Sequence, residues 1–96
     1  MIRFSWDEEK AKGNIKKHVV SFEEAVTVFF DPLSATFGDP DHSIQEQRCI
    51  TVGYSTRGRL LIVSYTERGK TIRIISARKA TTLERKRYED ETRKFL

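Results

Sequence analysis

A change of hydrophobic period near residue 31 constrains the fold of this 96-residue chain more than any other feature. Between residues 22 and 30 apolar side chains follow a helical spacing, whereas residues 33–77 contain strand-like runs, most of them alternating in period two and one, 60–65, apolar on both faces. Glycine-containing turns at 55–58 and 67–70 separate these runs, so successive strands are expected to pair as antiparallel hairpins. Helices followed by a block of strands predict an α+β domain, and the length allows a single one, residues 1–96.

Two helices are expected before the sheet. The first spans Glu8–Lys17 behind an N-cap at Asp7, and the second opens at Ser21 with Glu24 three residues later, which is the spacing of a capping box. Asp31-Pro32 should end the second helix. That helix should turn an apolar stripe towards the core, formed by Phe22, Val26, Phe29 and Phe30.

The remaining elements are strands and one last helix. The last helix should begin at a second capping box, Thr81 to Glu84, and it carries i,i+4 ion pairs instead of an apolar stripe. It should therefore pack loosely through Leu83 and Tyr88, or dock on a partner. We expect the two N-terminal helices on one face of a four-stranded antiparallel sheet, in addition to a short N-terminal strand. The expected strands cover residues 2–6, 33–37, 47–54, 60–65 and 71–77.

Charge is unevenly distributed along the chain, whose net charge is +4. Residues 1–56 carry six Lys and Arg against nine Asp and Glu, a balance of −3, whereas residues 57–96 carry twelve against five, a balance of +7. This asymmetry favours a polyanionic partner, although a solvated basic helix explains it equally well. We expect no membrane span and no signal peptide, because the chain has neither a long apolar run nor an apolar leader.

Several classes of site are excluded by their missing motifs. The two histidines, His18 and His42, do not occur in HxH or HExxH spacing and there is no CxxC, so no metal site is expected. The chain also lacks a P-loop, a GxGxxG and a GxSxG, so no cofactor is expected. Cys49, the single cysteine, lies in a strand-like run and is expected to be a packed thiol in a reducing, cytoplasmic environment.

The remaining candidates for chemistry are cations with one acid. Glu46 and Arg48 are two residues apart in an expected strand, so they share one face of the sheet. The first helix presents a polar face with His18 just beyond it, formed by Lys10, Asn14 and Lys17. For each cation the alternative is a solvated or ion-paired side chain.

Two further arginines lie at junctions between elements. Arg68 is in a hairpin turn, and Arg78 is where the last strand meets the last helix, so that its guanidinium and the helix N-terminus would converge on one phosphate. RNA cleavage without a metal needs a base for the ribose 2′-OH, cations for the phosphorane charge and an acid for the departing 5′-oxygen. Arginine suits the second role because its planar guanidinium binds two phosphate oxygens at once.

A series of motifs resembles the BrnT family of bacterial toxins over nearly the whole chain. The stretches Trp-Asp-x-x-Lys and Arg-Ile-Ile-Ser-Ala-Arg are specific in combination. The family usually has Gly after Lys-His, where this chain has Val19, which leaves open the turn before the second helix and the direction of His18. The matching segments are Trp6-Asp7, Lys10, Asn14, Lys17-His18, Ser21-Phe22-Glu23-Glu24-Ala25, Val28-Phe29, Asp31-Pro32, Glu46-Gln47-Arg48, Gly53-Tyr54, Tyr65-Thr66-Glu67-Arg68, Ile72 through Arg78, Ala80, Glu84-Arg85 and Tyr88.

The resemblance implies a RelE-like ribonuclease fold and RNA cleavage that arrests translation. It also implies neutralisation by a BrnA-type antitoxin whose ribbon-helix-helix part binds operator DNA, with a toxin homodimer inside a heterotetramer as one arrangement. Activity is expected to depend on Lys10, His18, Glu46, Arg48, Arg68 and Arg78. RNA contacts are expected from Lys17, Arg73, Lys79 and Tyr88.

We assign these residues hypothetical roles in RNA cleavage. Glu46 or His18 acts as the base, Arg68 and Arg78 clamp the phosphate, and His18 or Lys10 acts as the acid. Trp6 and Phe22 are expected in the core. The rival hypothesis is a non-catalytic nucleic-acid-binding or adaptor module whose basic face only docks phosphates.

Overall fold

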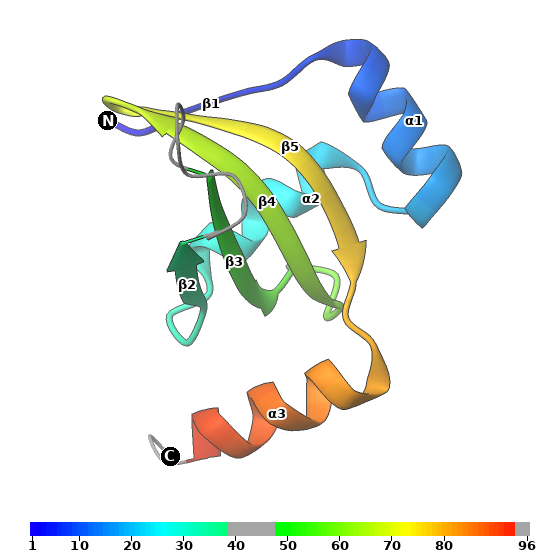
Figure 1. Ribbon diagram of the computed structural model, residues 1–96, viewed down its shortest axis with the longest axis vertical. Coiled ribbons are helices and arrows are strands. Elements are labelled where there is room, and N and C mark those ends of the chain that lie inside the picture. Colours follow the sequence, from blue (N-terminus) through cyan, green and yellow to red (C-terminus); the bar gives the residue numbers. More distant parts are fainter. Residues whose placement is uncertain (39–47, 94–96) are drawn as a thin grey trace.

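The computed structural model describes residues 1–38 and 48–93 of the chain (Figure 1). Its elements in chain order are β1 (Arg3–Ser5), α1 (Glu8–His18), α2 (Phe22–Thr27), the 3₁₀ turn η1 (Val28–Phe30), β2 (Ala35–Gly38), β3 (Arg48–Tyr54), β4 (Leu60–Arg68), β5 (Thr71–Lys79) and α3 (Thr82–Thr92). The three expected N-caps are confirmed: the side chains of Asp7, Ser21 and Thr81 each accept a hydrogen bond from a backbone N–H of the first turn.

One mixed sheet of five strands, in the order β1-β5-β4-β3-β2, forms the centre of the fold. The expected hairpins are confirmed, because β3, β4 and β5 pair antiparallel in succession, and β2 also pairs antiparallel with β3. The prediction of a purely antiparallel sheet is wrong for one pair of strands. β1 joins as a fifth strand and runs parallel to β5, a pairing that the long intervening chain of α1, α2, η1, β2, β3 and β4 permits.

The sheet has two different faces, and a β-bulge sets which residues of β5 lie on each. Leu61, Val63 and Tyr65 of β4 are buried on the face covered by α1 and α2, here called the helix-covered face. The pairing shifts between Ser64 and Tyr65, which face Ser76 and Ile74, so Ile75 is an extra residue. The bulge therefore changes the alternation in β5 at this point.

The core lies between α2, α1 and the helix-covered face. Phe22 and Val28 are fully buried, and Trp6 packs edge-on against Phe22 with ring centroids 5.9 Å apart, as expected for core residues. The expected stripe is wrong at its end, because Phe30 is 73% exposed. The reason is that the α-helix gives way to a 3₁₀ turn at Val28, and its three residues per turn bring Ala25 and Val28 inward instead.

The Asn14 side chain joins α1 to the outer edge of β5 by hydrogen bonds of the kind that a neighbouring strand would make. β1 pairs with Thr71–Arg73, and along the outer edge of β5 beyond them no strand of residues 1–38 or 48–93 is paired. There the buried Asn14 amide donates to the Ala77 carbonyl at 2.8 Å and accepts from the Ala77 N–H at 3.1 Å, and it also donates to the Val20 carbonyl. Asn14 is therefore a structural residue that fixes α1 along this edge.

α3 is set apart from the other helices (Figure 1). It lies against the face of the sheet opposite to the helix-covered face that α1 and α2 cover, here called the second face, near the start of β4 and the end of β5. Tyr88 is 8% exposed, as expected for a packing residue, but Leu83 is 60% exposed. No helix within residues 1–38 and 48–93 is long and apolar enough to cross a membrane.

Candidate nucleic-acid interface

Arginines from four strands gather on the second face, at the end opposite to α3. Residues paired across a sheet project from the same face, and the register places Arg48 opposite Thr66 and Thr66 opposite Arg73. The β4–β5 and β5–β1 pairings continue these rows to Arg68 and Arg3. We call Arg3, Arg48, Arg68 and Arg73 the arginine cluster.

Within the arginine cluster, arginines alternate with threonine or serine both along β1, β4 and β5 and across neighbouring strands. One row reads Arg48, Thr66, Arg73 and Ser5, and the next reads Arg68, Thr71 and Arg3. No two arginines stand directly opposite each other, which avoids the destabilising pairing of like charges. Because neighbouring strands lie about 4.8 Å apart, Arg48 and Arg73 are separated by about 10 Å between Cα atoms.

This end of the second face is purely cationic and polar among the described strand residues. The strand positions on this face there carry arginine, threonine or serine and none carries a carboxylate, and Thr66 in the middle is only 3% exposed. Arg73 is exposed, and its Nη1 donates to the Ser5 hydroxyl at 3.4 Å. Such a surface suits phosphate groups, because guanidinium and hydroxyl groups both donate hydrogen bonds to phosphate oxygens.

The β-bulge at Ile75 places Arg73 and Arg78 on the same face. These residues are five positions apart, so an unbroken strand would point them to opposite faces. With the bulge, Arg73 pairs with Thr66 and Arg78 pairs with Ile62, both of which lie on the second face. Sequence alternation alone could not indicate this arrangement.

Arg78 is engaged by a carboxylate at the start of α3. Its guanidinium binds Glu84 through two hydrogen bonds of 2.8 and 2.9 Å, and Glu84 also accepts from the Thr81 N–H at 2.9 Å. The hydrogen bonds from Arg78 lower the pKa of Glu84 to about 2. The expected convergence of Arg78 and the helix N-terminus on a phosphate is thus filled by the chain's own carboxylate.

Tyr88 anchors α3 rather than facing solvent. Its hydroxyl donates to the Leu33 carbonyl at 2.9 Å and lies 3.3 Å from Asp31 Oδ2, which also accepts from the Tyr54 N–H at 2.8 Å. Burial and the neighbouring Asp31 carboxylate raise the pKa of Tyr88 to about 12. Gly53 permits this packing, since a Cβ there would lie 2.9 Å from the Ser34 side chain.

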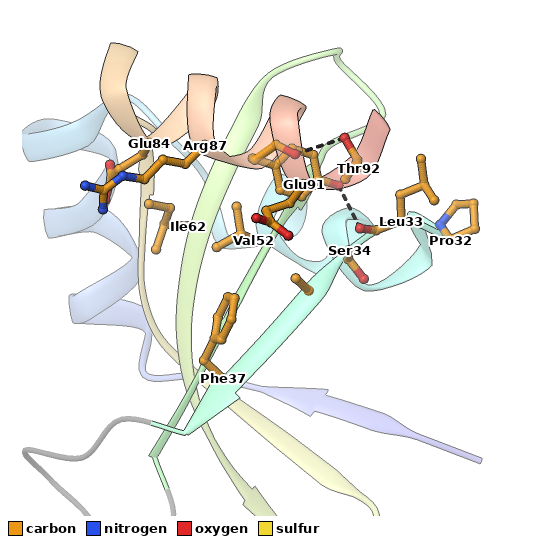
Figure 2. A pocket seen from close by; sticks show the side chains of 12 residues that line it. Pro32, Leu33, Ser34, Phe37, Val52, Ile62, Glu84, Arg87, Glu91 and Thr92 are labelled. Carbon is orange, nitrogen blue, oxygen red and sulfur yellow. Dashed lines mark hydrogen bonds between the residues drawn. The ribbon is translucent and has the colours of Figure 1, made fainter. Parts of the chain in front are cut away.

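A groove of about 680 Å³ separates α3 from the sheet (Figure 2). Phe37, Val52 and Ile62 form its apolar floor, and Glu84, Arg87 and Glu91 of α3 form its polar wall. Tyr88 also lines the groove, and its hydroxyl donates to the Leu33 carbonyl. The groove therefore exists because α3 is held at its anchoring residues and carries no apolar stripe that would fill the space.

Of the other predicted site residues, Lys10 and Lys17 are exposed and His18 is half-buried, all on α1, which packs against β5. Backbone hydrogen bonds from Lys10 and Glu9 lower the pKa of Asp7, and the charges of Lys10 and Arg73 lower it further, so Lys10 and Arg73 both lie near Asp7. Lys79 pairs with Leu61 and so lies on the helix-covered face. Glu46 lies outside the described residues.

A buried ion pair near the C-terminal end of α1 was not anticipated from the sequence. Glu24, whose side chain is 4% exposed, accepts from Ser55 Oγ at 2.7 Å and from Arg59 Nε at 2.9 Å. Arg59 also donates to the Val19 carbonyl at 3.0 Å. The bonds from Arg59 keep the pKa of Glu24 below its ordinary value despite burial. Glu24 was recognisable only as a capping-box residue, because its partners are thirty or more positions away.

Val19 ends α1 in the left-handed conformation, with φ 58° and ψ 36°. This explains why a glycine is usual at this position, since a Cβ is unfavourable there. The turn is held by the Arg59 bond to the Val19 carbonyl and by the Asn14 bond to the Val20 carbonyl. Cys49 packs against the core cluster, as expected. Within the described residues, no three His, Cys, Asp or Glu side chains are grouped to hold a metal ion.

Comparison with known proteins agrees with this architecture. The crystal structure of the Brucella abortus ribonuclease toxin BrnT matches with a TM-score of 0.63 at 21% identity, covering 85% of this chain and 100% of that chain. No protein in the curated set matches. Residues 6–84 match the family described as the ribonuclease toxin BrnT of type II toxin–antitoxin systems. The chain therefore belongs to the BrnT family of ribonuclease toxins.

Proposed function

We propose that this chain is an endoribonuclease that uses the arginine cluster to hold the RNA phosphate during cleavage by the neighbouring ribose 2′-oxygen. The observation that supports this proposal is the row Arg48, Thr66 and Arg73, which spans three strands on a face that α1 and α2 leave uncovered. Two guanidinium groups about 10 Å apart at their Cα atoms can reach one phosphate from opposite sides, since an arginine side chain is long.

The chemistry requires no metal. The 2′-oxygen attacks phosphorus while the bond to the 5′-oxygen breaks, which leaves a 2′,3′-cyclic phosphate and a 5′-hydroxyl. Glu46, two residues before Arg48, takes the 2′-hydroxyl proton, and the departing 5′-oxygen takes a proton from water. Arg48, Arg68 and Arg73 stabilise the charge that develops on the phosphorane oxygens, which is the step where preorganised donors contribute most.

The residues of α1 are assigned no part in this step. Lys10, Lys17 and His18 belong to a helix that packs along β5, two strands away from Arg48. Arg78 is assigned a positioning role, because its bidentate bond to Glu84 holds the start of α3 beside the second face.

The biological consequence we propose is arrest of translation through RNA cleavage in the cytoplasm. A BrnA-type antitoxin neutralises the toxin, and its ribbon-helix-helix part brings the complex to operator DNA. The family described for this chain is a type II system, in which toxin and antitoxin are both proteins, and this supports a protein inhibitor. Measuring the molecular mass of the co-expressed toxin and antitoxin tests whether they form a heterotetramer that contains a toxin homodimer.

Incubation of the purified chain with bulk RNA in excess EDTA tests the enzymatic proposal. The expected result is cleavage at an undiminished rate, with 2′,3′-cyclic phosphate or 3′-phosphate ends. Strict dependence on Mg²⁺ with 3′-hydroxyl products contradicts the mechanism. Tight RNA binding with no cleavage under either condition supports the rival hypothesis of a non-catalytic module.

A further inference from the structure

Strand β1 adds a fourth column to the arginine cluster. Arg3 pairs with Thr71 and Ser5 pairs with Arg73, so both point to the second face. Phe4 between them packs against the core. This strand precedes residues 6–84, over which the chain matches its family.

The contact between Arg73 and Ser5 links this column to the rest of the cluster. Arg73 Nη1 donates to Ser5 Oγ at 3.4 Å, so the guanidinium extends towards β1. The Ser5 hydroxyl accepts that bond and keeps its own hydrogen for another acceptor. Arg3 lies one row away on the same strand, about 7 Å from Ser5 between Cα atoms. Arg3 and Ser5 therefore place two further donors beside Arg73 at the edge of the sheet.

We propose that Arg3 and Ser5 form a second phosphate subsite at the edge of the arginine cluster, which holds another phosphate of the single-stranded RNA whose cleaved phosphate lies at Arg48 and Arg73. The subsite rests on the proposed function, because it binds the same substrate. Three strand spacings separate Arg48 from β1, a distance of about 14 Å. An RNA must therefore be longer than a dinucleotide, which has one internucleotide phosphate, to span both sites.

The spacing gives the proposal a length-dependent signature. RNA that spans both sites gains the Arg3 contact, whereas RNA that reaches only Arg48 does not. The contact also has a salt signature, because each phosphate contact on single strands contributes about −0.7 to the slope of log K against log salt.

Fluorescence anisotropy with 2′-O-methyl RNA tests the subsite without cleavage, since the methyl group removes the nucleophile. Affinity is measured for two-nucleotide and eight-nucleotide probes at several salt concentrations, with the unaltered chain, Arg3→Gln, Arg3→Lys and Arg85→Gln. Arg85 is an exposed arginine of α3 outside the cluster and serves as the matched control.

The expected result is that Arg3→Gln weakens binding of the eight-nucleotide probe about 5- to 10-fold and reduces its salt slope by about 0.7, with Arg3→Lys in between. The two-nucleotide probe should not distinguish the variants. Equal affinities of Arg3→Gln and Arg85→Gln for the long probe overturn the subsite, while cleavage by the unaltered chain leaves the proposed function standing. Failure of the unaltered chain to bind or cleave any RNA overturns both proposals.

Discussion

Replacing Val19 by glycine should stabilise the protein, although it removes a hydrophobic side chain. Val19 has φ 58°, a conformation that costs a residue with a Cβ roughly 1–2 kcal/mol. Its side chain is 65% exposed, so little apolar burial is lost with it. Glycine also makes the unfolded chain more flexible, which lowers the free energy of unfolding by about 0.4–1 kcal/mol and offsets part of the gain. The net free energy of unfolding should rise by about 0.5–1 kcal/mol.

Thermal melting of Val19→Gly measures this effect. For a domain of this size the gain corresponds to an increase in Tm of about 3–6 °C. Val19→Ala keeps the Cβ and should gain less, and Val19→Asn should lie between the two, because asparagine tolerates the left-handed region better than most residues. A Val19→Gly protein that melts at or below the temperature of the unaltered chain would refute the argument. That result would mean that contacts of the Val19 side chain stabilise the turn by more than the left-handed backbone conformation costs.

Two further predictions concern the anchors of α1 and α3. Asn14→Ala leaves the N–H and carbonyl of Ala77 and the carbonyl of Val20 without this partner, and it should lower the free energy of unfolding by about 3 kcal/mol in urea titration, whereas Lys16→Ala should change it little. An equal, small effect of both would show that water replaces Asn14. Glu84 has its folded pKa at about 2, below the ordinary 4.5, so its pairing stabilises the fold above pH 4.5 and is lost as the pH falls towards 2. Arg78→Ala should therefore cost about 1 kcal/mol at pH 7, because the pair is partly exposed, and much less at pH 2, with the fold retained. A cost that is independent of pH would contradict this account of the pair.

The parts of the fold that depend on neighbouring residues were predictable from the sequence. Asp7, Ser21 and Thr81 cap the helices as expected, because a cap is completed within three residues. The hairpins were also predictable, since short turns leave consecutive strands no other partner. The stripe of the second helix was misjudged at Phe30, where the backbone tightens into a 3₁₀ turn.

The candidate site was only partly predictable, because its geometry depends on pairing between distant strands. Arg48, Arg68 and Arg73 were chosen for their charge and their resemblance to a family, but their common face follows from the register and from the bulge at Ile75. Arg3 was not considered, since nothing in its neighbourhood indicates that β1 pairs parallel with β5. Arg78 was expected to bind phosphate, and its partner Glu84 became evident only in three dimensions.

The most direct test of the arginine cluster is the single-turnover rate of RNA cleavage by Arg48→Gln and Arg73→Gln, each beside Arg85→Gln and each with its melting curve. Loss of one preorganised donor to the phosphorane should slow cleavage by about 10²–10³. Arg85→Gln should cleave at the rate of the unaltered chain, and all three variants should stay folded at the assay temperature. Cleavage at an unchanged rate by folded Arg48→Gln and Arg73→Gln would contradict the account.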